Sequence, residues 1–112
     1  MNLHQKSRKA LYLQWFSLLS NKKWWKPLKI PIKLNQTKAK NNEAFIVFGK
    51  KYKTGKNIFN LSYKSNLNEA AKNLYKTLRL IKNKNYKMIC VSSIPKNGIG
   101  LAINDRLNRA AN

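Results

Sequence analysis

The C-terminal stretch "NGIGLAINDRLNRAAN", residues 97–112, has residue types and spacing suited to binding an anion or a partner domain. Gly98 and Gly100 stand at the start of an expected helix, where unpaired N–H groups and the helix dipole favour negative charge. Asn104 and Arg106 follow in its first two turns and complete the candidate site. The pattern lacks the third glycine and the distant acidic residue of a dinucleotide fingerprint, so a simple turn into a helix is the alternative interpretation.

An ion pair is predicted on the same helix. Asp105 lies near the helix N-terminus, where the dipole stabilises a carboxylate, and Arg109 follows four residues later. Residues at this spacing share one helix face, so the two side chains are expected to meet. Such a pair on a solvated face needs no function beyond stability.

The composition gives little support to other catalytic or metal chemistry. Cys90 is the only cysteine, which excludes a disulfide within the chain, and we expect it to be a small core residue in a reducing compartment. The one histidine, His4, has no evident partners for a nucleophilic triad. These residues and the three acids Glu43, Glu69 and Asp105 do not suggest a metal cluster. We therefore expect no metal and no cofactor in this chain.

The charge of the chain is strongly basic and has two explanations. Lys and Arg number 24 against 3 Asp and Glu, giving a formal net charge of +21. Such a surface binds RNA or tRNA non-specifically, and Trp15, Trp24 and Trp25 could stack on bases. The lysines are nevertheless spread over the whole length beside asparagines, as A-rich coding bias produces, and the tryptophans are equally suited to packing. A small basic RNA-binding protein, associated with ribosomes, is therefore the alternative function.

The elements that position these residues fit one domain, residues 28–112, after an atypical N-terminal helix and linker, residues 1–27. The apolar run at residues 10–19 is too short to span a bilayer and lacks the cleavage site of a signal peptide. Pro27 and Pro31 exclude helix and predict an extended linker that leads into a strand. We expect a cytoplasmic protein without a membrane span.

Three apolar runs predict strands after this linker. Residues 43–49 and 57–62 are short runs separated by a basic loop. The run Met88–Val91 is continuous rather than alternating, which is typical of a strand buried on both faces. A final helix is expected to start near Gly100.

The strongest helix prediction lies between the second and third of these runs. Asn66 is placed to cap it, and Glu69 is placed as the reciprocal partner of a capping box. Apolar residues then recur at three- and four-residue steps through about Lys82, which gives one core face. The order strand, strand, strand, helix, strand, helix predicts a small layered α/β domain with a partly parallel sheet.

These motifs together resemble the C-terminal accessory domain of the threonylcarbamoyl-AMP synthases, in the short, alphaproteobacterial-type form. The resemblance rests on "NLS" at residues 60–62, "EAAKNLYKTLR" at 69–79, "IP" at 94–95 and "GIGLAINDRLNRAA" at 98–111. It implies a Rossmann-like α/β domain joined by a linker to a YrdC-like catalytic domain. The family enzyme condenses threonine, bicarbonate and ATP, with Mg, to threonylcarbamoyl-adenylate, which is used to modify an adenosine of tRNA.

The chain departs from this pattern in its linker and in its extent. The linker reads "KKWWKPLKIP", in which Pro27 and Pro31 are the remnant of the family sequence. The 112 residues contain no YrdC-like domain. The resemblance therefore implies a detached accessory domain, not catalytic alone, whose partner is a separate YrdC-like catalytic domain. A gene fragment without function is the remaining alternative.

Overall fold

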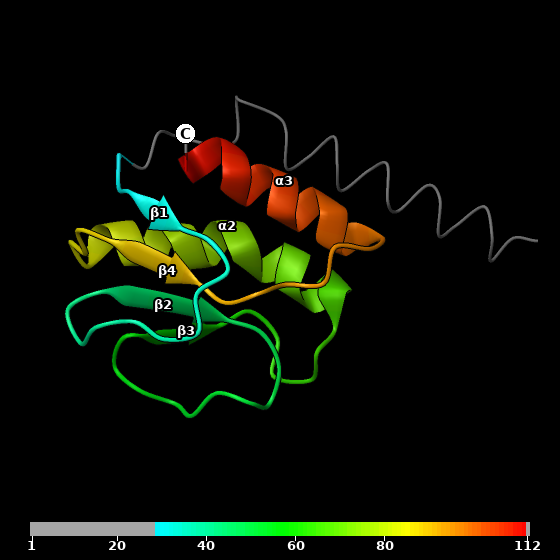
Figure 1. Ribbon diagram of the computed structural model, residues 1–112, viewed down its shortest axis with the longest axis horizontal. Coiled ribbons are helices and arrows are strands. Elements are labelled where there is room, and N and C mark those ends of the chain that lie inside the picture. The colour runs from blue at the N-terminus through cyan, green and yellow to red at the C-terminus, as the bar shows by residue number, and fades with distance from the viewer. Residues whose placement is uncertain (1–28, 112) are drawn as a thin grey trace, which may run out of the picture.

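The computed structural model describes residues 29–111 and confirms the α/β order predicted for them. The predicted N-terminal helix, the three tryptophans, His4 and Pro27 lie outside the described residues. The elements, labelled in Figure 1, are β1 (Ile32–Lys33), β2 (Ala44–Val47), β3 (Ile58–Asn60), α2 (Leu67–Asn83), β4 (Ile89–Val91) and α3 (Ile99–Ala111).

The four strands form one sheet in the order β1-β4-β2-β3, and all three pairings between them are parallel. The sheet of the described residues is thus wholly parallel, where the sequence predicted partly parallel pairing. β4 lies between β1 and β2, with Ile89 level with both Ile32 and Ala44. This central place suits its side chains, which are buried on both faces. Because the strands are parallel, their carboxyl ends share one edge, and both helices begin there.

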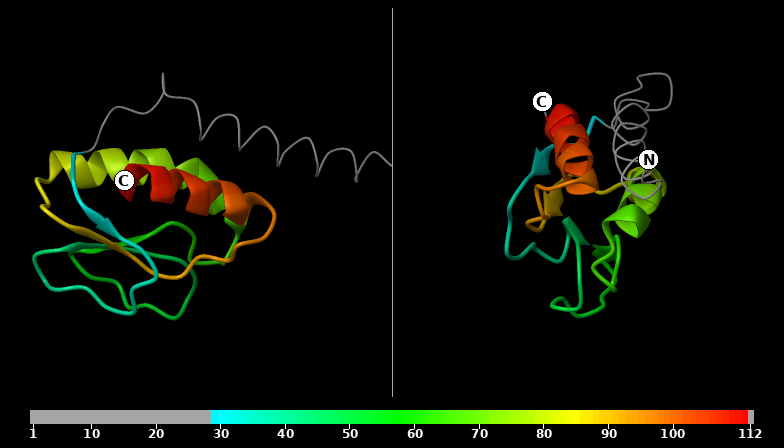
Figure 2. Two further views of the ribbon diagram at one scale, coloured as in Figure 1. Left: turned by 45° about the horizontal axis from the view of Figure 1, so that its top comes forward. Right: turned by 90° about the vertical axis from the view of Figure 1, so that its right-hand side faces the viewer.

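The two faces of the sheet are covered differently. Both helices lie on one face (Figure 2), where Ile46 and Val91 belong to the main core. On the other face Phe45 and Cys90 form a smaller cluster, against which Tyr52 of the following loop packs. The rings of Phe45 and Tyr52 meet edge to face, with centroids 5.4 Å apart. Since successive strand residues point to opposite faces, β2 and β4 supply both clusters.

α2 begins with a cap that differs in one half from the predicted capping box. Asn66 Oδ1 accepts a hydrogen bond of 3.1 Å from the Glu69 N–H, as predicted. The Asn66 N–H, however, donates to Ser62 Oγ at 2.9 Å, so Glu69 as its partner is wrong. A tight turn with Ser65 at φ 60° brings Ser62 back to the helix start. The predicted core face is confirmed by the buried residues Ala70, Ala71, Leu74, Leu78 and Ile81.

α3 starts at Ile99, one residue before the predicted start. Ile103 and Leu107 are fully buried against the sheet and α2, while Ala110 and Ala111 are partly buried against the same core. Each fully buried aliphatic side chain of this kind stabilises the fold by about 1.5–3 kcal/mol relative to its exposed state. The burial of these side chains holds α3 against the core, and the start of α3 sets where the preceding loop must end.

Candidate functional site

The predicted anion or domain-contact loop lies at the carboxyl edge of the sheet, between Val91 at the end of β4 and Ile99 at the start of α3. Ligands of open parallel α/β sheets gather at this edge. Of the four predicted site residues, Gly98, Gly100 and Asn104 belong to this loop and the helix turn tied to it.

The two glycines have different surroundings. Gly98 adopts φ +52°, and a Cβ placed there would meet no atom within 4 Å. Gly100 is buried, and a Cβ there would overlap the carbonyl oxygen of Pro95. The N–H groups of Gly100 and Leu101 already donate to Asn97 O at 2.9 Å and Gly98 O at 3.1 Å. The N–H of Gly100, one of the two glycines of the predicted anion site, is therefore used to close the turn, as is the N–H that follows it.

Asn104 ties the helix to the loop. Its Nδ2 atom donates to Gly100 O at 2.7 Å, to Ile94 O at 3.1 Å and, more weakly, to Pro95 O at 3.4 Å. Both backbone carbonyls of the "IP" dipeptide are thus held by one amide group. The Asn104 side chain thereby stabilises the path of the chain from β4 into α3. The N–H groups of this side chain are engaged within the domain.

Arg106 does not share this site with Asn104. The two residues are two positions apart, or roughly 200° around the helix, so their side chains leave different sides of α3. Arg106 is half-buried, and burial followed by the charge of Arg109 lowers the pKa of its guanidinium. The predicted ion pair is confirmed, with Arg109 Nε 3.1 Å from Asp105 Oδ2 on a partly exposed face.

Pro31, the second predicted linker residue, lies directly before β1 and is exposed. Its carbonyl oxygen accepts a hydrogen bond of 2.9 Å from the Ile89 N–H, which begins the pairing of β1 with β4. The residue therefore sets where the chain joins the sheet.

A contact between Glu43 and Cys90 was not predicted from the sequence. Cys90 Sγ donates to Glu43 Oε1 at 3.6 Å, and the same oxygen accepts the Lys40 N–H at 2.9 Å. The bond from Lys40 is the main reason that the pKa of Glu43 is lowered. Burial, then the charge of Glu43, raises the pKa of the Cys90 thiol. The thiol is therefore protonated and poorly nucleophilic at neutral pH.

Neither a metal cluster nor a membrane-spanning helix is present among the described residues. Across residues 29–111, no three His, Cys, Asp or Glu side chains come close enough to hold a metal ion. In the same part of the chain, neither helix has the length and apolar character needed to cross a bilayer.

The comparison with protein families shows to which family the chain belongs. A family model described as "Threonylcarbamoyl-AMP synthase, C-terminal domain" matches residues 5–112. The chain belongs to this family. No curated protein and no solved structure matches the chain. The match begins upstream of residue 28, where we placed the start of the domain from the sequence.

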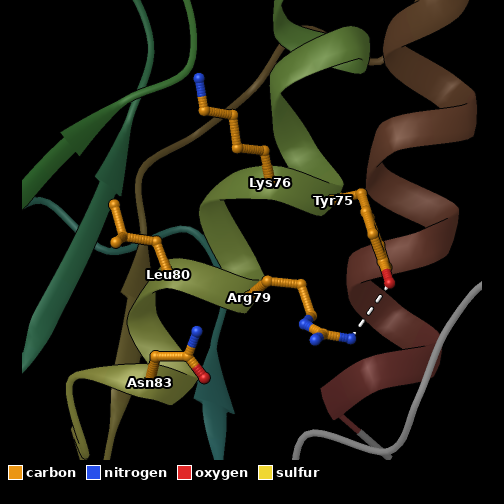
Figure 3. Close-up of a pocket in the computed structure, with 5 residues that line it drawn as sticks. All are labelled: Tyr75, Lys76, Arg79, Leu80 and Asn83. Carbon is orange, nitrogen blue, oxygen red and sulfur yellow. Dashed lines mark hydrogen bonds between the residues drawn. The ribbon is translucent and has the colours of Figure 1, made fainter.

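This threonylcarbamoyl-AMP synthase C-terminal domain has a hollow of about 480 Å³ on the exposed side of α2 (Figure 3). Tyr75, Lys76, Arg79, Leu80 and Asn83 line it. Arg79 Nη1 donates to the Tyr75 hydroxyl at 3.2 Å, and the guanidinium carbon lies 5.8 Å from the centre of the Tyr75 ring. Arg79 is thus held along the helix, while Leu80 and Lys76 point toward the side on which β3 lies.

A second hollow of about 290 Å³ lies beside the first, on the side of β3. It shares the lining residues Lys76 and Leu80 with the first and adds Phe59 and Asn60 of the edge strand. We name these two adjacent hollows the α2 groove. Sequence reasoning missed it because helical periodicity identifies the buried face only. Leu80, which lies off that face and is 43 % exposed, was the available signal.

Proposed function

We propose that this chain forms an accessory domain that acts with a YrdC-like catalytic domain, and that these residues do not catalyse the reaction alone. The catalytic domain would form threonylcarbamoyl-adenylate from threonine, bicarbonate and ATP for the modification of a tRNA adenosine. ATP and Mg would bind to that domain. The family match over residues 5–112 carries this proposal.

The geometry of the polar residues favours a structural role for them over a catalytic one. Asn104 holds the loop carbonyls, and Asp105 pairs with Arg109. Glu43 accepts hydrogen bonds from the Lys40 N–H and the Cys90 thiol. Each of these groups is engaged by another part of the same domain, so each stabilises the domain itself.

The proposal is tested by mixing the chain with a separately expressed YrdC-like catalytic domain from the same source and measuring threonylcarbamoyl-adenylate formation. The chain alone should form no adenylate, and its addition should raise the rate of the catalytic domain. Polylysine of comparable charge is the control, because it supplies the positive charge without the fold. Absence of both binding and any effect on rate would contradict the proposal.

The RNA-binding alternative receives no support from the family match. Its candidate stacking residues, Trp15, Trp24 and Trp25, lie outside the described part of the chain. Charge alone predicts tRNA binding that weakens steeply with salt and shows no preference among RNAs. A salt-resistant, tRNA-selective complex that is lost when Trp24 and Trp25 are changed to alanine would instead favour the alternative.

A further inference from the structure

We propose that the α2 groove docks an acidic, amphipathic segment of the catalytic domain, an inference that rests on the function proposed above. The groove combines an exposed leucine with basic side chains along one helix. Both features point to a partner that supplies apolar side chains and carboxylates together.

The positive charge follows one side of α2. Lys72, Lys76 and Arg79 are spaced by four and three residues, which places them on one helix face. Lys76 and Arg79 line the groove itself. The one acid of α2, Glu69, lies in its first turn, three residues before Lys72 but more than one turn away from Lys76 and Arg79. Lys76 and Arg79 therefore have no carboxylate of α2 beside them.

The chain cannot supply side-chain carboxylates to this face from elsewhere. Its three acids have places in the fold: Glu43 beside Lys40 and Cys90, Glu69 at the start of α2, and Asp105 in its ion pair with Arg109. Residues 1–28 contain no Asp or Glu and several lysines. A second copy of a chain with net charge +21 would repel this face. Charge complementarity thus favours a different, acidic polypeptide.

The floor of the groove favours protein over RNA. Leu80 is 43 % exposed, and a phosphate backbone would leave this apolar surface unused. The aromatic rings are already engaged: Phe59 meets Tyr86 edge to face at 6.0 Å, and Arg79 lies over the ring of Tyr75. Base stacking needs open ring faces. An amphipathic segment would bury Leu80 and place carboxylates, one helical turn apart, against Lys76 and Arg79.

The test measures, by calorimetry, the affinity of the full chain for the separately expressed catalytic polypeptide. The variants Lys76→Glu and Leu80→Ser alter the groove. Lys38→Glu and Leu101→Ser are matched controls outside the groove, since Leu101 is 41 % exposed and Lys38 is also exposed. All four positions are on the surface, and circular dichroism should show unchanged folding. Each groove variant should weaken binding tenfold or more, and each control less than twofold.

Four results would overturn the inference. If the unmodified chain binds but the groove variants bind equally well, the docking surface lies elsewhere and the proposed function still stands. If the controls alone weaken binding, the contact lies on another surface of the domain. If Lys76→Glu weakens binding to both the catalytic polypeptide and tRNA while Leu80→Ser weakens neither, charge alone acts. Absence of binding by the unmodified chain contradicts the proposed function and this inference together.

Discussion

Replacement of Gly100 by alanine tests the joint between β4 and α3. At an open helix position this change stabilises a protein by about 1 kcal/mol, because alanine has the higher helix propensity. Here the new Cβ would overlap the Pro95 carbonyl oxygen. Because the obstructing atom is backbone, no side-chain rotation can relieve the overlap. The first turn of α3 must therefore move away from the loop.

The size of the effect follows from two losses and one gain. Overpacking of this kind costs about 1–3 kcal/mol. Displacement of the turn also weakens the Asn104 hydrogen bonds to Ile94 and Pro95, at about 1 kcal/mol. Offset by the gain in helix propensity, the net destabilisation should be about 2 kcal/mol. For a domain of this size, that lowers the melting temperature by roughly 10 °C.

The assay is thermal unfolding followed by circular dichroism, with Gly98→Asn as the matched control. Gly98 has φ +52° and open space around it, and asparagine tolerates the left-handed region. This control should therefore melt close to the unmodified chain. A Gly100→Ala variant that is as stable as the unmodified chain, or more stable, would refute the close approach of α3 to Pro95.

Three further predictions concern the cap and the second face of the sheet. Asn66→Ala should destabilise the domain by about 1 kcal/mol in urea unfolding, because the Glu69 N–H loses its acceptor, whereas exposed Asn108→Ala should cause no loss. Because the pKa of Glu43 is lowered in the folded state, its carboxylate stabilises the fold fully above the unfolded carboxyl pKa, and this stabilisation is lost as pH falls through the folded pKa. Glu43→Gln should therefore flatten the acid side of a plot of unfolding free energy against pH. An unchanged acid side would contradict this prediction. The Cys90 thiol is buried and its pKa is raised, so it should react with iodoacetamide at neutral pH only as fast as the domain opens. Rapid labelling of the folded chain would contradict the burial of Cys90.

The sequence predicted the elements whose signals are local. The core face of α2 follows from the spacing of its apolar residues, and the Asn66 cap acceptor from its position before them. The burial of β4 on both faces follows from its continuous apolar run. The Asp105–Arg109 pair was predictable because four residues along a helix fix the distance between two side chains.

Features that depend on the packing of distant segments were not predictable in this way. The place of β4 between β1 and β2 depends on strand pairing that no local pattern encodes. Ser62 replaces Glu69 at the cap because a turn returns it to Asn66. Glu43 and Cys90 meet across 47 positions of the chain. Chemical type alone suggested Asn104 as an anion ligand, whereas the path of the loop makes it a brace for two carbonyl groups.

The measurement that tests the central claim most directly is a titration of the YrdC-like catalytic domain with this chain, followed by the rate of threonylcarbamoyl-adenylate formation. If the chain is an accessory domain, the rate rises and saturates at the concentration at which calorimetry shows the two polypeptides to bind. A rate that stays constant across the titration, or adenylate formation by the chain without the catalytic domain, would contradict the account.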